Sequence, residues 1–214
     1  MLSRVSVPRR FAVRFTRREV AENHWKLEER NRYHRRFGYD VGKGIAFVLS
    51  KCLPLRGRVL EIGTGQGRFA MALGPRVRHF ESIDADPAVL RIAALNLAWR
   101  KLTGRVRLYL ADAERLPWLP GTCDAVVTMN AMHHMRAPVR VVAEMLRVVK
   151  PGGRIVIADF SPAGFRIMGR IHASEGRVHP GGRCRMDGLR RRLTASGRRA
   201  RLFRGTSQDV LVAD

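Results

Sequence analysis

Three closely spaced glycines follow a short apolar stretch and would let a ligand approach the backbone. Residues 59–62 (Val-Leu-Glu-Ile) predict a buried strand. Gly63, Gly65 and Gly67 predict a tight turn, and apolar residues from Phe69 onwards predict a helix. Glycine permits strained backbone angles, and the start of a helix presents free amide groups. The pattern therefore predicts a corner that binds an anion or a nucleotide.

The spacing of these glycines argues against a dinucleotide. A dinucleotide-binding turn has the pattern G-x-G-x-x-G, whereas this chain has G-x-G-x-G followed by Arg68. Glu61, just before the turn, would repel a pyrophosphate and suit a cationic ligand. Residues 59–70 resemble the first motif of class I S-adenosylmethionine-dependent methyltransferases, whose ligand carries a sulfonium and an ammonium group. The motif alone leaves open a glycine turn in an unrelated α/β protein.

Two acidic residues at the ends of predicted strands extend this resemblance. Asp84 follows the strand at 79–83, about 20 residues after the first glycine, where an acid can accept hydrogen bonds from ribose hydroxyls. Asp112 follows the strand at 106–110 and resembles the acid of the family's adenine-binding motif. Each acid alone is equally compatible with a helix cap or a turn. The resemblance implies a cofactor-binding set of Glu61, Gly63, Thr64, Gly65, Gly67, Asp84, Ala85, Asp112, Ala113 and Asn130.

Two further segments match the family in its own order. Residues 124–134 look like its fourth-strand motif, and residues 146–153 look like the helix and turn before its fifth strand. The chain is similar to the small-molecule branch that includes the ubiquinone/menaquinone-biosynthesis C-methyltransferases. The resemblance implies a methyltransferase enzyme with S-adenosyl-L-methionine as cofactor and a small-molecule acceptor.

Two other functions stay open. The first is an RNA or ribosomal methyltransferase, which the net charge of +23 favours. However, the basic residues are spread along the chain, which predicts at most weak, non-specific nucleic-acid binding. Enzymes that methylate the exocyclic amines of bases usually carry Asn/Asp-Pro-Pro-Tyr/Phe where residues 130–133 read Asn-Ala-Met-His. The second is a non-catalytic S-adenosylmethionine-binding protein, which the intact Glu61, Asp84 and Asp112 disfavour.

Two adjacent histidines follow the fourth predicted strand and are the candidate catalytic residues. Methyl transfer from a sulfonium depends mainly on positioning and on exclusion of water. A general base is needed only where the acceptor loses a proton, and histidine suits that task near neutral pH. His134 is the better candidate, followed by His133. The alternative is that these histidines only shape the pocket.

The segment from 167 to 182 is predicted to border the acceptor pocket together with the His133-His134 loop. His172, Glu175 and His179 are spaced three and four residues apart and would share one face of a helix. A solvated loop, a substrate lid and a metal site of two histidines and a carboxylate are the three interpretations. We expect a substrate role for His172, Glu175 and Arg177, with Arg177 facing an anionic group, and no metal.

The order of elements predicts an α/β fold. We expect a three-layer, doubly wound, mostly parallel seven-stranded sheet with an antiparallel edge strand. Residues 1–37 are predicted to form a basic leader and a helix, and residues 38–214 the methyltransferase domain, with 161–185 as an inserted lid-like segment. Residues 1–18 lack acids and resemble a disordered leader more than a transit peptide.

Composition also predicts the compartment. The three cysteines are scattered, without a C-x-x-C pair, which fits a reducing compartment. No apolar run reaches the roughly 18 residues of a membrane span. We therefore expect a cytoplasmic protein without a membrane span; the oligomeric state and the acceptor atom are not encoded in a readable pattern.

Overall fold

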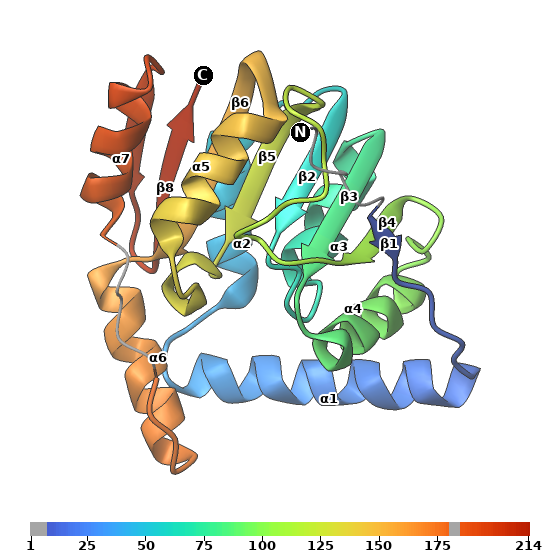
Figure 1. Ribbon diagram of the computed structural model, residues 1–214. Helices are drawn as coiled ribbons and strands as arrows, with labels where there is room; N and C mark the ends of the chain where they lie inside the picture. Colours follow the sequence, from blue (N-terminus) through green and yellow to red (C-terminus); the bar gives the residue numbers. More distant parts are fainter. Residues whose placement is uncertain (1–7, 180–184) are drawn as a thin grey trace.

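A single mixed sheet forms the centre of the protein (Figure 1). The computed structural model describes residues 8–179 and 185–214. Within them, eight strands lie in the order β1-β4-β3-β2-β5-β6-β8-β7. The strands are β1 (Arg9–Arg10), β2 (Arg58–Ile62), β3 (His79–Asp84), β4 (Val106–Leu110), β5 (Cys123–Met129), β6 (Val149–Phe160), β7 (Ala200–Arg204) and β8 (Gln208–Ala213).

Helices connect the strands and cover both faces of the sheet. They are α1 (Arg17–Arg36), α2 (Val41–Cys52), α3 (Arg68–Leu73), α4 (Pro87–Trp99), α5 (Pro138–Val148), α6 (Pro162–Ser174) and α7 (Met186–Ala195), with short 3-10 helices η1 (Gly74–Arg76) and η2 (Met132–His134). Successive side chains of a strand point to opposite faces. Val59 accordingly packs into the core with α2, α3 and α4, whereas Leu60 packs into the core with α5 and α7. The predicted three-layer, doubly wound arrangement is confirmed.

The directions of the strands also follow the prediction. Strands β2 to β6 are parallel, and β8 runs antiparallel between β6 and β7. The seven predicted strands are all present. The eighth, β1, corrects the expectation of a disordered leader for its two residues, because Arg9 and Arg10 pair with Leu110 and Tyr109 at the open edge of β4.

The boundary before β6 differs from the prediction as well. The resemblance implies a helix and turn at residues 146–153, before the fifth strand. Instead β6 begins at Val149, which already pairs with Cys123, and the register shifts between Cys123 and Ala125. The irregularity lets the strand continue through Pro151 and Gly152, where Gly152 takes a positive φ of 72°.

The order of the strands reverses at β2. The chain continues from β2 to β3 on one side, and later returns through β5 on the other side. In open α/β sheets a ligand binds in the crevice outside the carboxyl ends of the strands at such a point. Figure 1 shows these ends pointing toward α1, which crosses the lower edge of the view.

Helix α1 is fixed to the sheet domain by polar contacts. Its start has a capping box, in which Thr16 and Glu19 bond each other's backbone amides. Farther along, the Asn23 side chain donates to Asn96 Oδ1 in α4 at 2.7 Å, and Asn31 accepts from Arg68 in α3. The division of the chain at residue 37 stays a prediction. Within the described ranges, no helix is both long and apolar enough to cross a membrane.

Helix α6 borders the site and packs tightly at its start. A Cβ added to Gly164 would lie 2.3 Å from the carbonyl oxygen of Ser207, whereas one added to Gly169 in the same helix would meet nothing within 4 Å. We expect Gly164→Ala to destabilise the protein by roughly 1–3 kcal/mol, because the helix must shift away from the backbone of Ser207. Gly169→Ala is the matched control and should stabilise it by about 0.5–1 kcal/mol. Urea unfolding of both variants measures the difference, and equal effects would contradict this packing.

Candidate functional site

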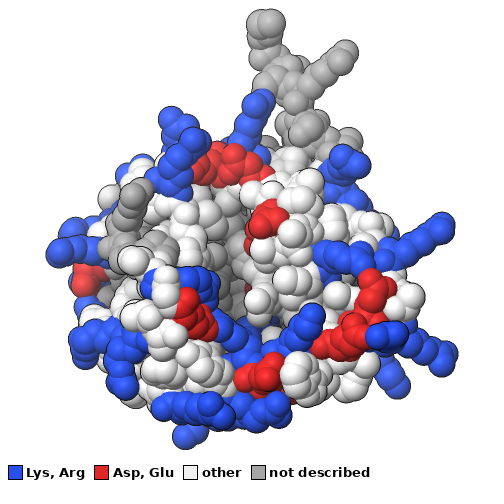
Figure 2. All heavy atoms as spheres, turned by 90° about the horizontal axis from the view of Figure 1, so that it is seen from below, with Lys and Arg blue, Asp and Glu red and all other residues white. Residues whose placement is uncertain are grey.

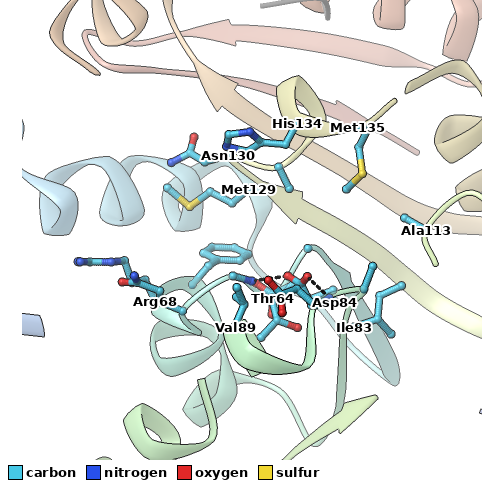
Figure 3. A pocket seen from close by; sticks show the side chains of 18 of the residues that line it. Thr64, Arg68, Ile83, Asp84, Val89, Ala113, Met129, Asn130, His134 and Met135 are labelled. Atoms are coloured by element: carbon cyan, nitrogen blue, oxygen red, sulfur yellow. Dashed lines mark hydrogen bonds between the residues drawn. The ribbon is translucent and has the colours of Figure 1, made fainter. Parts of the chain in front are cut away.

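A cavity of about 780 Å³ opens at the carboxyl ends of the central strands. Ten of the residues singled out from the sequence line it, and they come from the ends of β2, β3, β4 and β5: Glu61, Gly63, Thr64, Gly65, Asp84, Ala85, Asp112, Ala113, Asn130 and His134. Figure 3 shows Thr64, Arg68, Asp84 and Val89 on one side of the cavity and Met129, Asn130, His134 and Met135 on the other. Gly67, His133, His172, Glu175 and Arg177 do not line it.

The three glycines of the turn serve different purposes. All have positive φ, at 79° for Gly63, 52° for Gly65 and 75° for Gly67. A Cβ on Gly63 would lie 2.4 Å from the Cβ of Ala131, so glycine there lets the turn touch the loop after β5. A Cβ on Gly67 would lie 3.2 Å from Ala93 in α4, so Gly67 provides helix packing. Gly65 faces open space and leaves room for a ligand.

Asp84 joins the end of β3 to this turn. Its Oδ2 accepts from the backbone N–H of Gly65 at 2.8 Å, and its Oδ1 accepts from Asp86 N–H at 3.1 Å. The N–H groups of Gly63 and Thr64 donate to the carbonyl of Ile83 at 2.9 and 2.8 Å. The turn and the carboxylate therefore hold each other in place at the floor of the cavity.

Glu61 is a buried carboxyl group at the cavity wall. Ser82 Oγ donates to Glu61 Oε2 at 2.5 Å, and the hydroxyls of Ser82 and Thr64 lie 2.6 Å apart. Burial raises the pKa of Glu61 to about 8, and the charge of Asp84 adds to this rise, while the bond from Ser82 opposes it. Within the described part of the chain no basic side chain pairs with Glu61, so a cation in the cavity would stabilise its charged form.

Asp112 lies in a tight turn at the end of β4. Its Oδ1 accepts from Glu114 N–H at 2.8 Å, and its side chain is exposed. Glu114 in turn accepts from Ala137 N–H at 3.0 Å, which ties this turn to the start of α5. The carboxylates of Asp84 and Asp112 thus line the same end of one cavity, as the sequence predicted.

The opposite end of the cavity is apolar and aromatic and was missed from the sequence. It is formed by Tyr39, Met129, Phe160 and Met168. Tyr39 packs edge-on against Phe160 at 5.7 Å between ring centroids, and its hydroxyl accepts from Gln208 Nε2 at 3.0 Å. These residues come from segments far apart in the chain. Only Phe160 lies in a stretch that the sequence distinguishes, the apolar run of β6.

Arg68 is a second residue that the sequence analysis did not assign to the site. It lines the cavity, and its guanidinium donates to Asn31 of α1. Burial lowers the pKa of Arg68, although arginine stays charged at neutral pH. The guanidinium supplies a positive charge on a wall that otherwise carries Glu61 and Asp84.

The two candidate catalytic histidines lie in different surroundings. His134 lines the cavity, and burial lowers its pKa, so the ring is neutral at pH 7. The His133 side chain is completely buried, and its Nδ1 lies 2.6 Å from Asp159 Oδ1. Asp159 Oδ2 also accepts from the His133 backbone N–H at 3.1 Å. His134 therefore has access to a bound molecule, whereas His133 is held behind it.

The segment expected to border the pocket lies beside this histidine loop. The ring centroids of His133 and His179 are 5.1 Å apart, and those of His172 and His179 are 4.6 Å apart. The expectation of one helical face is wrong, because α6 ends at Ser174 and Gly176 adopts a φ of 67°. Residues 180–182 of this segment lie outside the described ranges.

The charged residues of this segment contact one another. Glu175 pairs with Arg30 of α1 and with Arg177, whose Nε lies 3.1 Å from Glu175 Oε2. The guanidinium of Arg177 is thus directed at a neighbouring carboxylate. A substrate role for His172, Glu175 and Arg177 stays a prediction.

Comparison with known proteins agrees with this geometry. Residues 60–157 match the family described as "Methyltransferase domain". The chain is 30% identical over 125 residues to the ubiquinone/menaquinone biosynthesis C-methyltransferase of Syntrophotalea carbinolica, covering 58% of this chain and 53% of that protein. It is 33% identical over 116 residues to the demethylmenaquinone methyltransferase of Deinococcus radiodurans, covering 53% and 47%. The chain thus spans about half the length of these curated relatives.

A solved structure shows the same fold over nearly the whole chain. It is a putative S-adenosyl-L-methionine-dependent methyltransferase from Methanococcus maripaludis, with a TM-score of 0.65 and 14% identity. The match covers 95% of this chain and 96% of that one. Together with the motifs at the strand ends, these matches make residues 60–157 similar to a methyltransferase domain. The solved structure shows that the whole chain has the same fold.

Proposed function

We propose that this protein transfers a methyl group from S-adenosylmethionine to an apolar, ring-containing small molecule. The observation that carries the proposal is that one cavity has an acidic end and an apolar, aromatic end. Asp84 and Asp112 line its end under β3 and β4, Glu61 lies at the turn after β2, and an apolar, aromatic end follows toward α6. Its volume of about 780 Å³ lies high in the usual range of 300–1,000 Å³ for small-molecule sites.

The acidic end suits the adenosine part of the cofactor. A carboxylate offers about four lone-pair sites. Asp84 uses two of them for the N–H groups of Gly65 and Asp86. The remaining sites are available to the two ribose hydroxyls, while the exposed Asp112 side chain is available to the adenine amino group.

The middle of the cavity suits the charged part of the cofactor. Glu61 gains its charge most readily beside a cation, and the sulfonium and ammonium groups supply one. Arg68 is placed to bind the carboxylate of the methionine part. Both residues line the cavity close to Gly65, the glycine that leaves space open.

The apolar end suits the acceptor. Tyr39, Phe160 and the nearby methionines offer flat and adaptable surfaces for a ring. The curated relatives are named for ubiquinone, menaquinone and demethylmenaquinone chemistry, which involves ring compounds of this kind. A reduced quinone precursor is therefore our proposed acceptor class.

The transfer itself requires alignment and a dry site more than added chemistry. The activated methyl group moves in line from sulfur to the acceptor atom, so cavity walls that hold both molecules contribute most. The acceptor loses a proton in the same reaction. The neutral His134 ring, which faces the cavity, is the group placed to accept it.

The test is a transfer assay with purified protein, S-adenosylmethionine and a reduced demethylmenaquinone analogue. We expect S-adenosylhomocysteine and a methylated quinone by mass spectrometry. S-adenosylmethionine binding without turnover on a panel of quinols would rule out this acceptor class. Failure to bind the cofactor at all would rule out the enzyme proposal.

The proposed ribose contact predicts the effect of Asp84→Ala. The variant should weaken S-adenosylmethionine binding by about 1–3 kcal/mol. The ribose hydroxyl groups lose their acceptor, and the Gly65 N–H loses its hydrogen bond to the carboxylate. Asp40→Ala is the control, since Asp40 caps α2 at Lys43 N–H and does not line the cavity. Calorimetry with equal affinities for both variants would contradict the ribose assignment.

Cofactor affinity should depend on pH through Glu61. Its pKa of about 8 leaves it mostly protonated at pH 7, whereas a bound cation favours the carboxylate. Binding then releases a proton below pH 8, so affinity rises with pH by at most about tenfold per unit and levels off above pH 8. Calorimetry in buffers of different ionisation enthalpy measures the proton. Glu61→Gln should remove this release, and an unchanged release in that variant would refute the role of Glu61.

Replacement of His134 should affect turnover more than cofactor binding. We expect His134→Ala to lower kcat by about 10²–10⁴-fold, the usual contribution of a general base, with little change in cofactor affinity. His79→Ala is the control, because His79 is exposed at the start of β3, at the opposite end of that strand from Asp84. A kcat equal to that of the control would show that His134 only shapes the pocket.

The other expected partners and the location stay predictions. Figure 2 shows Lys and Arg side chains distributed around the face seen from below, interspersed with acidic groups, rather than gathered in one stripe. This distribution supports weak, non-specific binding of nucleic acid at most. The cytoplasmic location also stays a prediction.

A further inference from the structure

Four histidine side chains gather where the loop after β5 meets the end of α6. Neighbouring ring centroids lie 4.0 Å apart for His133 and His134, 5.1 Å for His133 and His179, and 4.6 Å for His172 and His179. Three of them, His133, His134 and His179, each offer a ligand atom within 4.8 Å of the others. Methyl transfer as proposed above uses only His134, so the gathering needs its own explanation.

The orientation of His133 is fixed by a carboxylate behind it. Asp159 Oδ1 accepts from His133 Nδ1–H at 2.6 Å and from Phe160 N–H at 2.8 Å, and Oδ2 accepts from His133 N–H at 3.1 Å. With the proton held on Nδ1, the other ring nitrogen, Nε2, carries a lone pair. A histidine that ligates a metal is typically held by a carboxylate in this way.

That lone pair is buried and has no partner. The His133 side chain has no exposed surface, and its Nε2 forms no hydrogen bond with any described residue. A buried acceptor without a donor is costly. His172 Nδ1, next to His179, is likewise buried and without a partner among the described residues. An electrophile at this point would satisfy the lone pair of His133.

The surroundings favour a metal ion as that electrophile. The neighbouring rings, those of His134 and His179, are also imidazoles. Neutral imidazole is the ligand form, and it suits first-row transition metals such as Zn²⁺. Phe160 and Phe165 pack against His133 at 5.4 and 5.3 Å and shield the point from water.

We propose that His133 Nε2, His134 and His179 bind a divalent transition-metal ion, with Zn²⁺ as the best fit. Three protein nitrogens leave one position of a tetrahedral ion open. Ligands of such an ion stand roughly 3.4 Å apart, given metal–nitrogen distances of about 2.0–2.1 Å. Closing separations of up to 4.8 Å to this distance requires a shift of up to about 1.4 Å, and His179 lies on the loop after α6 and outside any helix or strand.

The site differs from the metal site considered from the sequence. That alternative combined His172, Glu175 and His179, but Glu175 is engaged by Arg30 and Arg177. The open position of the ion would instead face the cavity beside His134. A bound ion would occupy the lone pair of His134, so the role of His134 as proton acceptor applies to the metal-free chain.

Metal binding is tested on the untagged full chain without cofactor or acceptor. After treatment with a chelator, titration with Zn²⁺ should show one ion per chain, and Co²⁺ should give the visible absorption of a tetrahedral site. His179→Ala, on a loop where folding is not at risk, should weaken binding at least tenfold. Asp159→Asn should weaken it about 10–100-fold, because the orientation of His133 is relaxed.

The controls separate this site from surface histidines. His24→Ala and His79→Ala should bind Zn²⁺ as the unaltered chain does, since neither lies in the cluster. Zn²⁺ should also raise the melting temperature of the unaltered chain but not that of His179→Ala. Equal binding by His179→Ala and the controls, or less than one ion per chain, would overturn the proposal. Either result leaves the cofactor and transfer assays unaffected, so the two proposals fail separately.

Discussion

The hydrogen bond from Gly65 N–H to the Asp84 carboxylate is the contact on which the cavity depends. It joins the turn after β2 to the end of β3 at 2.8 Å and therefore sets the floor against which any ligand lies. Because Gly65 has a positive φ of 52°, the turn points its amide at the carboxylate only in a conformation that glycine adopts easily. A structural contact and a ligand contact thus share one side chain, and replacing it affects both.

A second carboxylate performs the same task on the facing wall. Asp159, near the end of β6, holds the η2 loop through the ring and the backbone of His133. Gly63 then lets this loop approach the first turn, since any Cβ there would collide with Ala131. The cavity is therefore closed by two loops, each fixed by an acid from the adjacent strand. Their spacing follows from the spacing of the parallel strands, and helices are not needed to define it.

The parts that the sequence predicted have a common physical basis. The strand ends that carry Glu61, Asp84 and Asp112 can be recognised because each short apolar run is followed by a polar residue. In a parallel sheet the carboxyl ends of the strands lie at one edge, so these polar residues lie close together. What was missed depends on contacts between distant segments. Tyr39 reaches the cavity from the loop between α1 and α2, and Arg68, at the start of α3, is held by Asn31 of α1. No local pattern records either contact. The pairing of β1 was missed for the same reason, because two arginines carry no strand signal until they meet β4.

The helical face expected for His172, Glu175 and His179 failed for a local reason. Gly176 ends the helical path, and the turn that it permits brings His179 back toward His133. The spacing was correct for a helix, yet the glycine determined the geometry. Consequently the histidines of the two segments, which were predicted to border one pocket, form one cluster.

The charge of the cavity contrasts with that of the whole chain. A net charge of +23 would by itself repel a cationic cofactor, but exposed charges are screened beyond about 8 Å at physiological ionic strength. Glu61 and Asp84 act at much shorter range. Glu61 is shielded from water, so once a bound cation favours its carboxylate, solvent weakens their attraction little. The arginines around the face in Figure 2 extend outward into solvent, where their influence on the cavity is smallest. Local burial, and not net charge, therefore determines which ligand the cavity accepts, which is how a strongly basic protein can carry a site for a cation.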